Sequence, residues 1–461
     1  MIGLPIASQH VFSRGLDAAL IKLQHAAGGA QPPRHYLLSC TGCGATFEDD
    51  GYTLDCTLCR TPALLVSQYH ANELRVSVEE TGIYRYKSWL PVQRNLIGFS
   101  RSITYQSKRL SALTGLKKLW IAFNGYWPER GAHCFSGTFK ELEAHCVLGR
   151  LPIEDENVLV VASAGNTAAA FAWVCSLNRV RCLIVIPQGA LAHMRFEQPI
   201  ASCVKIVTVT GDGDYADAIR LAGHAAKLPG FFPEGGAKNV ARRDGLGTVL
   251  LNAYETIGRL PDYYFQAIGS GTGAIAVHEC ARRLSVDNTS LPRLWLSQNL
   301  PFAPIYHAWR TGARDWPHLP EEDAKQQISQ TQAQVLANRF PPYAIRGGLY
   351  EALVESKGEV LVVTNDQARN AAQLFEESEG IDIEPAAAVA FASLLTSTAG
   401  RRIPADATVL LNVTGGGRLR HFAEGRCMQS EADLQIEPAA IDSTRTLNEI
   451  AGLFAGTVAR C

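Results

Sequence analysis

The chain has 461 residues, which is enough for two or three domains with a large core. Hydrophobic residues make up 47% and charged residues 19%, as in an ordinary folded, water-soluble protein. The formal net charge of −1 excludes a general polyanion binder, and no run of about 18 apolar residues is present that could span a membrane. We therefore expect a globular protein that acts through a local site.

Residues 1–35 are expected to form an N-terminal extension. Residues 12–27 have an amphipathic helical pattern, which the glycine- and proline-rich residues 28–33 interrupt. The extension lacks the continuous apolar core of a secretory signal, so we expect a cytoplasmic location in which the 12 cysteines stay reduced. Four of them lie in apolar runs and should pack as small hydrophobic side chains: Cys175, Cys182, Cys203 and Cys280.

Four other cysteines have the spacing of a zinc ribbon. Two residues separate Cys40 from Cys43 and Cys56 from Cys59, and 12 residues separate the pairs. Two such knuckles can place four thiolates around one tetrahedral zinc ion. We expect a zinc-ribbon-like module with these four metal ligands.

The module should span residues 36–66, with short strands at 36–38 and 52–54 leading into the knuckles. A structural zinc ion fits this module better than contact with nucleic acid, because its sequence is acidic. The acidic residues are Glu48, Asp49, Asp50 and Asp55.

Beyond residue 118, apolar strand patterns alternate with helical patterns. Strands are expected at 119–123, 158–162, 182–186, 203–209, 264–268, 293–297, 359–363 and 408–413, and helices at 167–177, 215–227, 273–284, 366–377 and 384–395. Near-continuous Val/Ile/Leu strands between helices predict parallel sheets covered on both faces. Ligands of such folds bind beyond the carboxyl ends of the strands.

Glycine-rich turns follow three of these strands, at residues 163–167, 269–273 and 412–417. Small residues let backbone amides approach an anion, and a following helix adds the positive end of its dipole. Read singly, each turn is equally well explained as a helix cap or a tight turn, and 269–273 matches neither the P-loop nor the GxGxxG pattern. With Lys140, which follows Gly137-Thr138-Phe139 and opens a helical pattern, the turns describe a pocket for a small, planar, anionic cofactor.

This set of motifs resembles the pyridoxal-phosphate enzymes of the tryptophan synthase β/threonine synthase fold type, from about residue 40 to residue 417. The resemblance implies an α/β protein of PLP fold type II, with two doubly wound sheet domains and the N-terminal zinc-ribbon-like module. It implies a large domain made of residues 67–155 and 256–461, and a small mobile domain made of residues 156–255.

Within that group the chain is most similar to the cysteate synthases, on residues 137–144, 234–245 and 297–302. Threonine synthases typically continue with Lys-Asp-Arg, where this chain has Lys140-Glu141-Leu142. The resemblance implies β-replacement through an aminoacrylate intermediate, in which O-phospho-L-serine and sulfite give L-cysteate and phosphate on the route to coenzyme M. Three alternatives stay open: threonine synthesis from O-phosphohomoserine, another nucleophile on O-phosphoserine, and a ribbon-bearing binding protein with an inactive enzyme body.

The resemblance also implies residue roles. Lys140 would form the internal aldimine with pyridoxal 5'-phosphate and then act as base on the substrate Cα. Asn166 would contact the ring hydroxyl and Thr414 the pyridine nitrogen, where a neutral hydroxyl favours β-elimination and replacement over transamination. The cofactor phosphate would lie on Gly269, Ser270, Gly271, Thr272 and Gly273, and the substrate carboxylate on Ser163, Ala164, Gly165 and Thr167.

A basic loop follows the two glycines at 235 and 236. Leaving phosphate and incoming sulfite are oxyanions, which arginine binds through two parallel hydrogen bonds. Lys238, Arg242 and Arg243 are therefore predicted to bind substrate, although a solvated helix start would look similar, and Arg346 is a weaker candidate. We expect phosphoamino-acid and oxyanion substrates, no nucleic-acid or membrane partner, and a homodimer.

Overall fold

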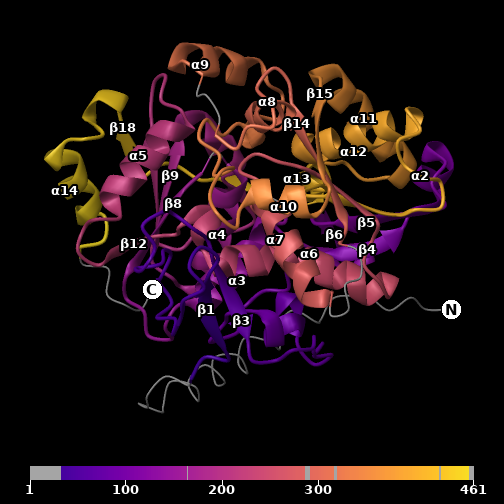
Figure 1. Cartoon of the computed structure of the whole chain (residues 1–461). Helices are drawn as coiled ribbons and strands as arrows, with labels where there is room; N and C mark the ends of the chain where they lie inside the picture. The colour runs from indigo at the N-terminus through magenta and orange to yellow at the C-terminus, as the bar shows by residue number, and fades with distance from the viewer. Residues whose placement is uncertain (1–32, 164, 286–290, 316–318, 425–426, 456–461) are drawn as a thin grey trace, which may run out of the picture. The chain divides into compact units, whose positions relative to one another are not determined.

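The computed structural model describes residues 33–163, 165–285, 291–315, 319–424 and 427–455. The predicted amphipathic segment at 12–27 lies outside the described residues. Residues 34–461 form one compact unit. Figure 1 shows this unit with a smaller sheet on the left, a larger sheet on the right and the helices α3, α4, α6 and α7 between them.

The N-terminal module is a three-stranded antiparallel sheet. Strand β1 (Tyr36–Cys40) pairs with β2 (Thr46–Phe47) on one side and with β3 (Leu65–Tyr69) on the other. The predicted strand at 52–54 is wrong, because backbone amides that would pair with another strand donate to the Asp50 side chain instead. Its Oδ1 accepts hydrogen bonds from the backbone amides of Tyr52 and Thr53, at 2.7 and 2.8 Å, which makes a turn.

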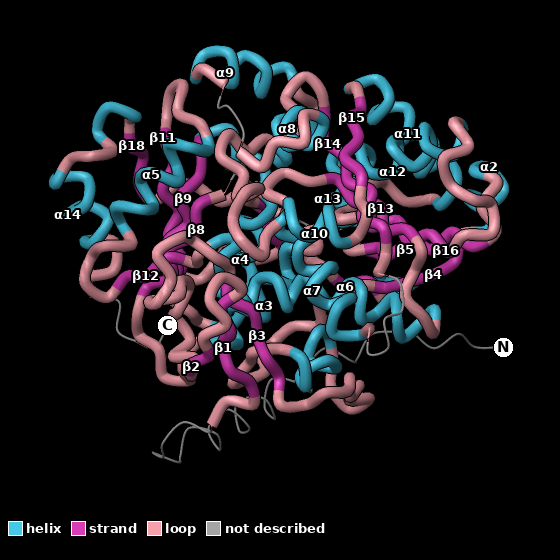
Figure 2. Tube along the Cα trace, viewed as in Figure 1, coloured by secondary structure: helices cyan, strands magenta, loops and turns pink. Residues whose placement is uncertain are grey.

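The larger sheet has six strands in the order β15-β14-β13-β16-β5-β4 (Figure 2). Five of them are parallel: β5 (Lys118–Phe123), β13 (Tyr263–Ala267), β14 (Arg293–Asn299), β15 (Glu359–Val363) and β16 (Thr408–Val413). The edge strand β4 (Ile103–Gln106) runs antiparallel to β5. The carboxyl ends of the five parallel strands thus share one edge of the sheet.

Helices cover both faces of this sheet because successive side chains of each strand point to opposite sides. Leu410 belongs to the core that includes α6 (Val240–Ile257) and α7 (Thr272–Leu284), whereas its neighbours Val409 and Leu411 belong to the core under α12 (Pro385–Ala399). The remaining helices around the larger sheet are α2 (Lys108–Thr114), α8 (Pro304–Arg310), α9 (Glu321–Gln330), α10 (Leu349–Glu355), α11 (Asn365–Glu379) and α13 (Arg418–Glu424).

The smaller sheet has five parallel strands in the order β12-β8-β9-β11-β18. They are β8 (Val158–Ala162), β9 (Cys182–Pro187), β11 (Val204–Val209), β12 (Phe231–Pro233) and β18 (Leu434–Ile436), and the accompanying helices are α3 (Lys140–Arg150), α4 (Asn166–Asn178), α5 (Tyr215–Ala225) and α14 (Thr444–Gly452). The prediction of two doubly wound sheets is confirmed.

One part of the predicted domain division is corrected. We expected residues 256–461 to belong entirely to the large domain, but β18 pairs with β11 of the smaller sheet and α14 packs on α5. The chain crosses over through β17 (Met428–Gln429), which pairs with β10 (Arg195–Phe196). Ile436 and Ile450 then fill the apolar core of the smaller sheet, so burial draws the C-terminal segment there.

Among the described residues, no helix combines the length and the apolar composition that crossing a membrane requires.

Candidate active site

Lys140 opens helix α3, and the three residues before it pair with the turn after β16. Thr138 forms an antiparallel bridge with Gly415, and the amide of Phe139 donates to the carbonyl of Thr414 at 2.9 Å. A Cβ atom on Gly415 would lie only 2.8 Å from the carbonyl oxygen of Gly137, so the close approach of the two segments requires glycine. The pairing places Lys140 and Thr414 in one neighbourhood.

The turn at 269–273 lies beyond β13, which is the neighbour of β16 in the larger sheet. Gly271 caps helix α7 with φ +80°, and a Cβ atom there would lie 2.5 Å from Leu349 Cδ2. Because β13 and β16 are adjacent and parallel, this turn and Thr414 share the same sheet edge. The amides at the start of α7 can therefore face an anion at that edge.

The turn at 163–167 connects β8 to α4, and its Ala164 lies outside the described residues. Ser163 Oγ accepts a hydrogen bond from the amide of Gly165 at 3.0 Å, and Thr167 Oγ1 donates to Glu143 at 3.0 Å. The Asn166 Oδ1 atom is buried and receives no hydrogen bond from any described residue. A buried acceptor of this kind fits a ligand that brings its own donor, such as a ring hydroxyl.

Lys140 lies in a buried ionic group, which we call the Lys140 cluster: Lys140, Glu143, Thr167, Glu234 and Arg242. Lys140 Nζ donates to Glu143 Oε2 at 3.1 Å, and Arg242 Nη2 donates to Glu143 Oε1 at 2.8 Å. On its other side Arg242 Nε lies 3.0 Å from Glu234 Oε1. The Glu143 side chain is fully buried and that of Lys140 is 20% exposed. The two cations and two carboxylates balance one another.

Burial lowers the pKa of Lys140, and the nearby Glu143 carboxylate opposes this effect. Burial also raises the pKa of Glu234, against the pull of Arg242. For Arg242 burial acts downward, but Glu143 and Glu234 outweigh it and raise its pKa. The arrangement thus keeps an arginine charged beside a lysine that gives up its proton more readily than an exposed one.

The three cations predicted in the basic loop point in different directions. Arg242 belongs to the Lys140 cluster, but Arg243 lies one helical position further and faces α7. Its Nε pairs with Glu279 at 3.0 Å, and its other nitrogens donate to the carbonyls of Ala237 and Leu65. The Arg243 guanidinium is therefore held by structural partners, away from Lys140.

Lys238 and Arg346 are likewise directed away from Lys140. Lys238 Nζ lies 2.7 Å from Asp55 Oδ1 of the N-terminal module, and its side chain is 40% exposed. Arg346 Nη1 donates to the carbonyl of Gly42 at 3.2 Å. Both side chains join the N-terminal module to the enzyme body, which is a structural reason for their presence.

Several charged residues of the site were missed from the sequence. Glu143 was visible in principle, because three residues from Lys140 on a helix is the same face. Arg418 could not be recognised from its neighbours in the sequence, because its partners are distant in the chain. Its Nη1 lies 3.0 Å from Glu384 Oε1 and 3.0 Å from His193 Nδ1. It packs over Gly137, and the His193 ring packs against Gly165, so this trio connects two of the predicted site loops.

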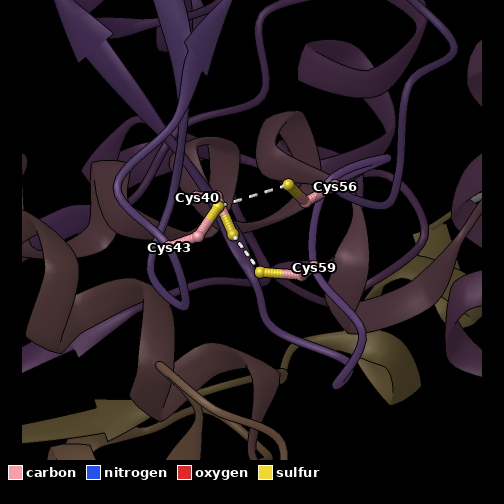
Figure 3. A group of neighbouring side chains, drawn as sticks. All are labelled: Cys40, Cys43, Cys56 and Cys59. Carbon is pink, nitrogen blue, oxygen red and sulfur yellow. Dashed lines mark hydrogen bonds between the residues drawn. The ribbon is translucent and has the colours of Figure 1, made fainter.

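The four predicted metal ligands converge, as Figure 3 shows. Their sulfur atoms all lie within 4.8 Å of one another, with Cys40 and Cys59 at 3.4 Å and Cys43 and Cys56 at 3.7 Å. A tetrahedral ion with Zn–S bonds of about 2.3 Å needs sulfur atoms about 3.8 Å apart. The donor set and its spacing fit a structural zinc ion.

Comparison with known proteins agrees with this geometry. A family model described as pyridoxal-phosphate dependent enzyme matches residues 104–415. A cysteate synthase of Methanosarcina acetivorans is 44% identical over 405 residues, which cover 87% of this chain and 96% of the relative. A cysteate synthase of Methanoculleus marisnigri is 46% identical over 390 residues, which cover 84% and 89%.

Solved structures share the fold at low sequence identity. Diaminopropionate ammonia lyase from Escherichia coli, in complex with an aminoacrylate-PLP azomethine reaction intermediate, superposes with a TM-score of 0.54 at 17% identity, covering 71% of this chain and 88% of that one. A pyridoxal 5'-phosphate-dependent aspartate racemase superposes with a TM-score of 0.51 at 18% identity, covering 68% and 90%.

Proposed function

Because the chain belongs to the pyridoxal-phosphate-dependent enzymes and, within them, to the cysteate synthases, we propose that it joins O-phospho-L-serine and sulfite to give L-cysteate and phosphate. The observation that carries this proposal is the 44–46% identity to named cysteate synthases across nearly their whole length. The carbon–oxygen bond to phosphate breaks and a carbon–sulfur bond to sulfite forms.

The described residues fit pyridoxal phosphate. Lys140 offers an amine, the start of α7 offers amides for the phosphate, Thr414 offers a hydroxyl, and the buried Asn166 Oδ1 needs a donor. We propose that Gly269, Ser270, Gly271, Thr272 and Gly273 hold the phosphate, as the resemblance implies. When bound, the cofactor withdraws electrons from the substrate Cα, which makes its proton removable and lets the β-substituent leave.

Lys140 is proposed as the base at Cα. Its pKa is lowered by burial, so the amine is free more often than that of a surface lysine, and Glu143 can stabilise the ammonium group that forms. The proton moves from Cα to Nζ and its electron pair stays with the substrate.

The substrate's charged groups need partners in the same place. We propose that Ser163, Ala164, Gly165 and Thr167 hold its carboxylate at the start of α4, because the first backbone amides of a helix have no acceptor within the helix. Of the three basic-loop residues, Arg242 lies in the Lys140 cluster and is proposed to bind the phosphate and then the sulfite. Lys238 and Arg243 have no such position and are left out of this role.

A structural zinc ion on Cys40, Cys43, Cys56 and Cys59 belongs to the same proposal and is supported by the sulfur spacing. A homodimer, a cytoplasmic location and a place on the route to coenzyme M are proposed from the family likeness alone.

The test is an assay of purified protein with pyridoxal phosphate, O-phospho-L-serine and sulfite, with cysteate detected by mass spectrometry. Cysteate and phosphate should appear in equal amounts. A parallel reaction with O-phosphohomoserine should give no threonine. Threonine formation, or phosphate release without any sulfonate, would overturn the proposed reaction.

A further inference from the structure

The Glu143 side chain touches three groups that belong to different parts of the predicted site. It accepts hydrogen bonds from the Lys140 ammonium at 3.1 Å, from the Thr167 hydroxyl at 3.0 Å and from the Arg242 guanidinium at 2.8 Å. Its two oxygens are shared unequally, because Lys140 binds Oε2 while Thr167 and Arg242 bind Oε1. One fully buried carboxylate thus joins the lysine, the carboxylate-binding loop and the proposed oxyanion ligand.

A neighbouring glutamate on the same helix shows that burial alone does not create this arrangement. Glu141 is also fully buried, but it accepts from Ser100 Oγ at 2.5 Å and from the amide of Ser136. Burial raises the pKa of Glu141 to about 7, and no cation of the described residues donates a hydrogen bond to it. Glu143 differs because two cations face it.

The charges around Lys140 act against one another. Glu143 favours the ammonium form of Lys140, and the positive charge of Arg242 disfavours it. An oxyanion that binds Arg242 would cancel part of that positive charge and compete for its hydrogen bonds. Glu143 would then act on Lys140 more strongly, and Lys140 would accept a proton more readily.

We propose that Glu143 is a positioning residue that couples oxyanion binding at Arg242 to proton uptake by Lys140. The oxyanion part of this inference rests on the function proposed above, whereas the contact of Glu143 with Lys140 does not. For catalysis this means that phosphate binding precedes proton abstraction, because Lys140 is the stronger base when the phosphate group of the substrate is in place. Proton abstraction from substrates without that group is thereby disfavoured.

The test measures how fast Lys140 reacts with acetic anhydride in the cofactor-free full-length protein, as a function of pH, with peptide mass spectrometry as readout. Only the free amine reacts, so the rate reports the protonation of Lys140. Glu143→Gln removes the negative charge and keeps the size, so acetylation of Lys140 should become about tenfold faster below the transition, as expected for the loss of one neighbouring charge. Glu143→Asp keeps the charge and should stay nearer to the wild type.

Glu141→Gln is the matched control, because it changes an equally buried carboxylate on the same helix that does not touch Lys140. Its profile should equal that of the wild type. Equal profiles for Glu143→Gln and the wild type would overturn the proposal. If circular dichroism shows that Glu143→Gln does not fold, the proposal is tested by the phosphate measurement below, on the wild type and Arg242→Gln.

The second measurement adds inorganic phosphate to the same cofactor-free protein. Phosphate should slow the acetylation of Lys140 in the wild type, and this slowing should be lost in Arg242→Gln. An unchanged rate in the wild type, or equal slowing in Arg242→Gln through an anion bound elsewhere, would contradict the coupling. Because neither O-phosphoserine nor sulfite is used, a failure here and a failure to form cysteate are separate results.

Discussion

The N-terminal cysteine module contacts the C-terminal end of helix α3, and the Lys140 cluster lies at its N-terminal end. A positively charged side chain stands at each end, but its relation to the helix dipole differs. At the C-terminal end, Arg150 is buried and pairs with Asp49 of the module at 2.6 Å. A cation there agrees with the helix dipole. At the N-terminal end, the Lys140 ammonium opposes the dipole and depends on Glu143 for compensation.

One helix thus serves both stability and reactivity. Where charge, dipole and partner agree, as at Arg150, the pair holds the module in place. Where they conflict, as at Lys140, the group stays ready to change its protonation. We expect substitutions at the N-terminal end to affect turnover most, and those in the module to affect mainly folding.

The largest effect on turnover is expected for Lys140→Ala. Without the amine, the Cα proton has no base, and turnover should fall by about 10³-fold or more. The melting temperature should change little, since this side chain is partly exposed and its ammonium opposes the helix dipole. Initial rates and calorimetry check both parts. Residual turnover near the wild-type level would show that another residue is the base.

The next effect distinguishes two adjacent arginines. Arg242→Gln should lower kcat/KM for O-phosphoserine by about 10²-fold, because a charged hydrogen bond to an oxyanion is lost. Both variants should lower the melting temperature, because Arg243 pairs with the largely buried Glu279 and Arg242 pairs with the more deeply buried Glu143. Arg243→Gln should, however, leave KM unchanged in the folded fraction. Steady-state kinetics of both variants, combined with thermal unfolding, test this. If Arg243→Gln lowered kcat/KM and Arg242→Gln did not, the loop would bind substrate through Arg243.

The pair at the other end of α3 should appear in the pH dependence of stability. Burial alone would raise the pKa of Asp49, but the hydrogen bonds and charge of Arg150 outweigh it and lower the pKa below its ordinary value. A depressed folded-state pKa contributes stability above the unfolded value near 3.9, and that contribution is lost as the pH falls toward the folded-state value. The wild type should therefore lose stability on acidification below about pH 5.

Asp49→Asn should reduce this loss of stability on acidification. It should also lower the free energy of unfolding at neutral pH by about 3–5 kcal/mol, because Arg150 is left without its buried partner. Denaturant unfolding at several pH values measures both effects. A loss of stability on acidification equal to that of the wild type would assign the pH dependence to other carboxylates. Turnover of the folded variant should change only a few-fold.

The smallest effect on turnover is expected from metal removal. Atomic absorption should find one zinc ion per chain, and Cys43→Ser should lose it. Cys43 is exposed, and the module meets the enzyme body at Arg150, Lys238 and Arg346 rather than at Lys140. The rate at saturating substrate should therefore stay within a few-fold while thermal stability falls. A rate that collapses together with zinc content would give the module a direct role in the site.

The same contrast explains what could be predicted from the sequence. The four cysteines lie within 20 residues, so their spacing alone defines a metal site. The strands and glycine turns were also recognisable, because apolar runs and close backbone approach leave local patterns. The distant members of the Lys140 cluster left no such pattern, since Arg242 and Glu234 come from segments about 100 residues away. Arg242 reaches Glu143 through the packing of α3 on α6.

Side-chain direction was the other limit. Lys238, Arg242 and Arg243 look alike in the sequence. Lys238 precedes α6 and pairs with Asp55, and the rotation of α6 decides that Arg242 rather than Arg243 lies in the Lys140 cluster. In the same way, burial of Ile436 and Ile450 drew the C-terminal segment to the smaller sheet, although its sequence position suggested the larger one.

The role of Lys140 is tested most directly by reducing the pyridoxal-phosphate-loaded protein with borohydride, digesting it and locating the pyridoxyl group by mass spectrometry. The modification should lie on Lys140 alone, and the visible absorbance of the bound cofactor should be lost. A pyridoxyl group on any other lysine, or none at all, would contradict this role.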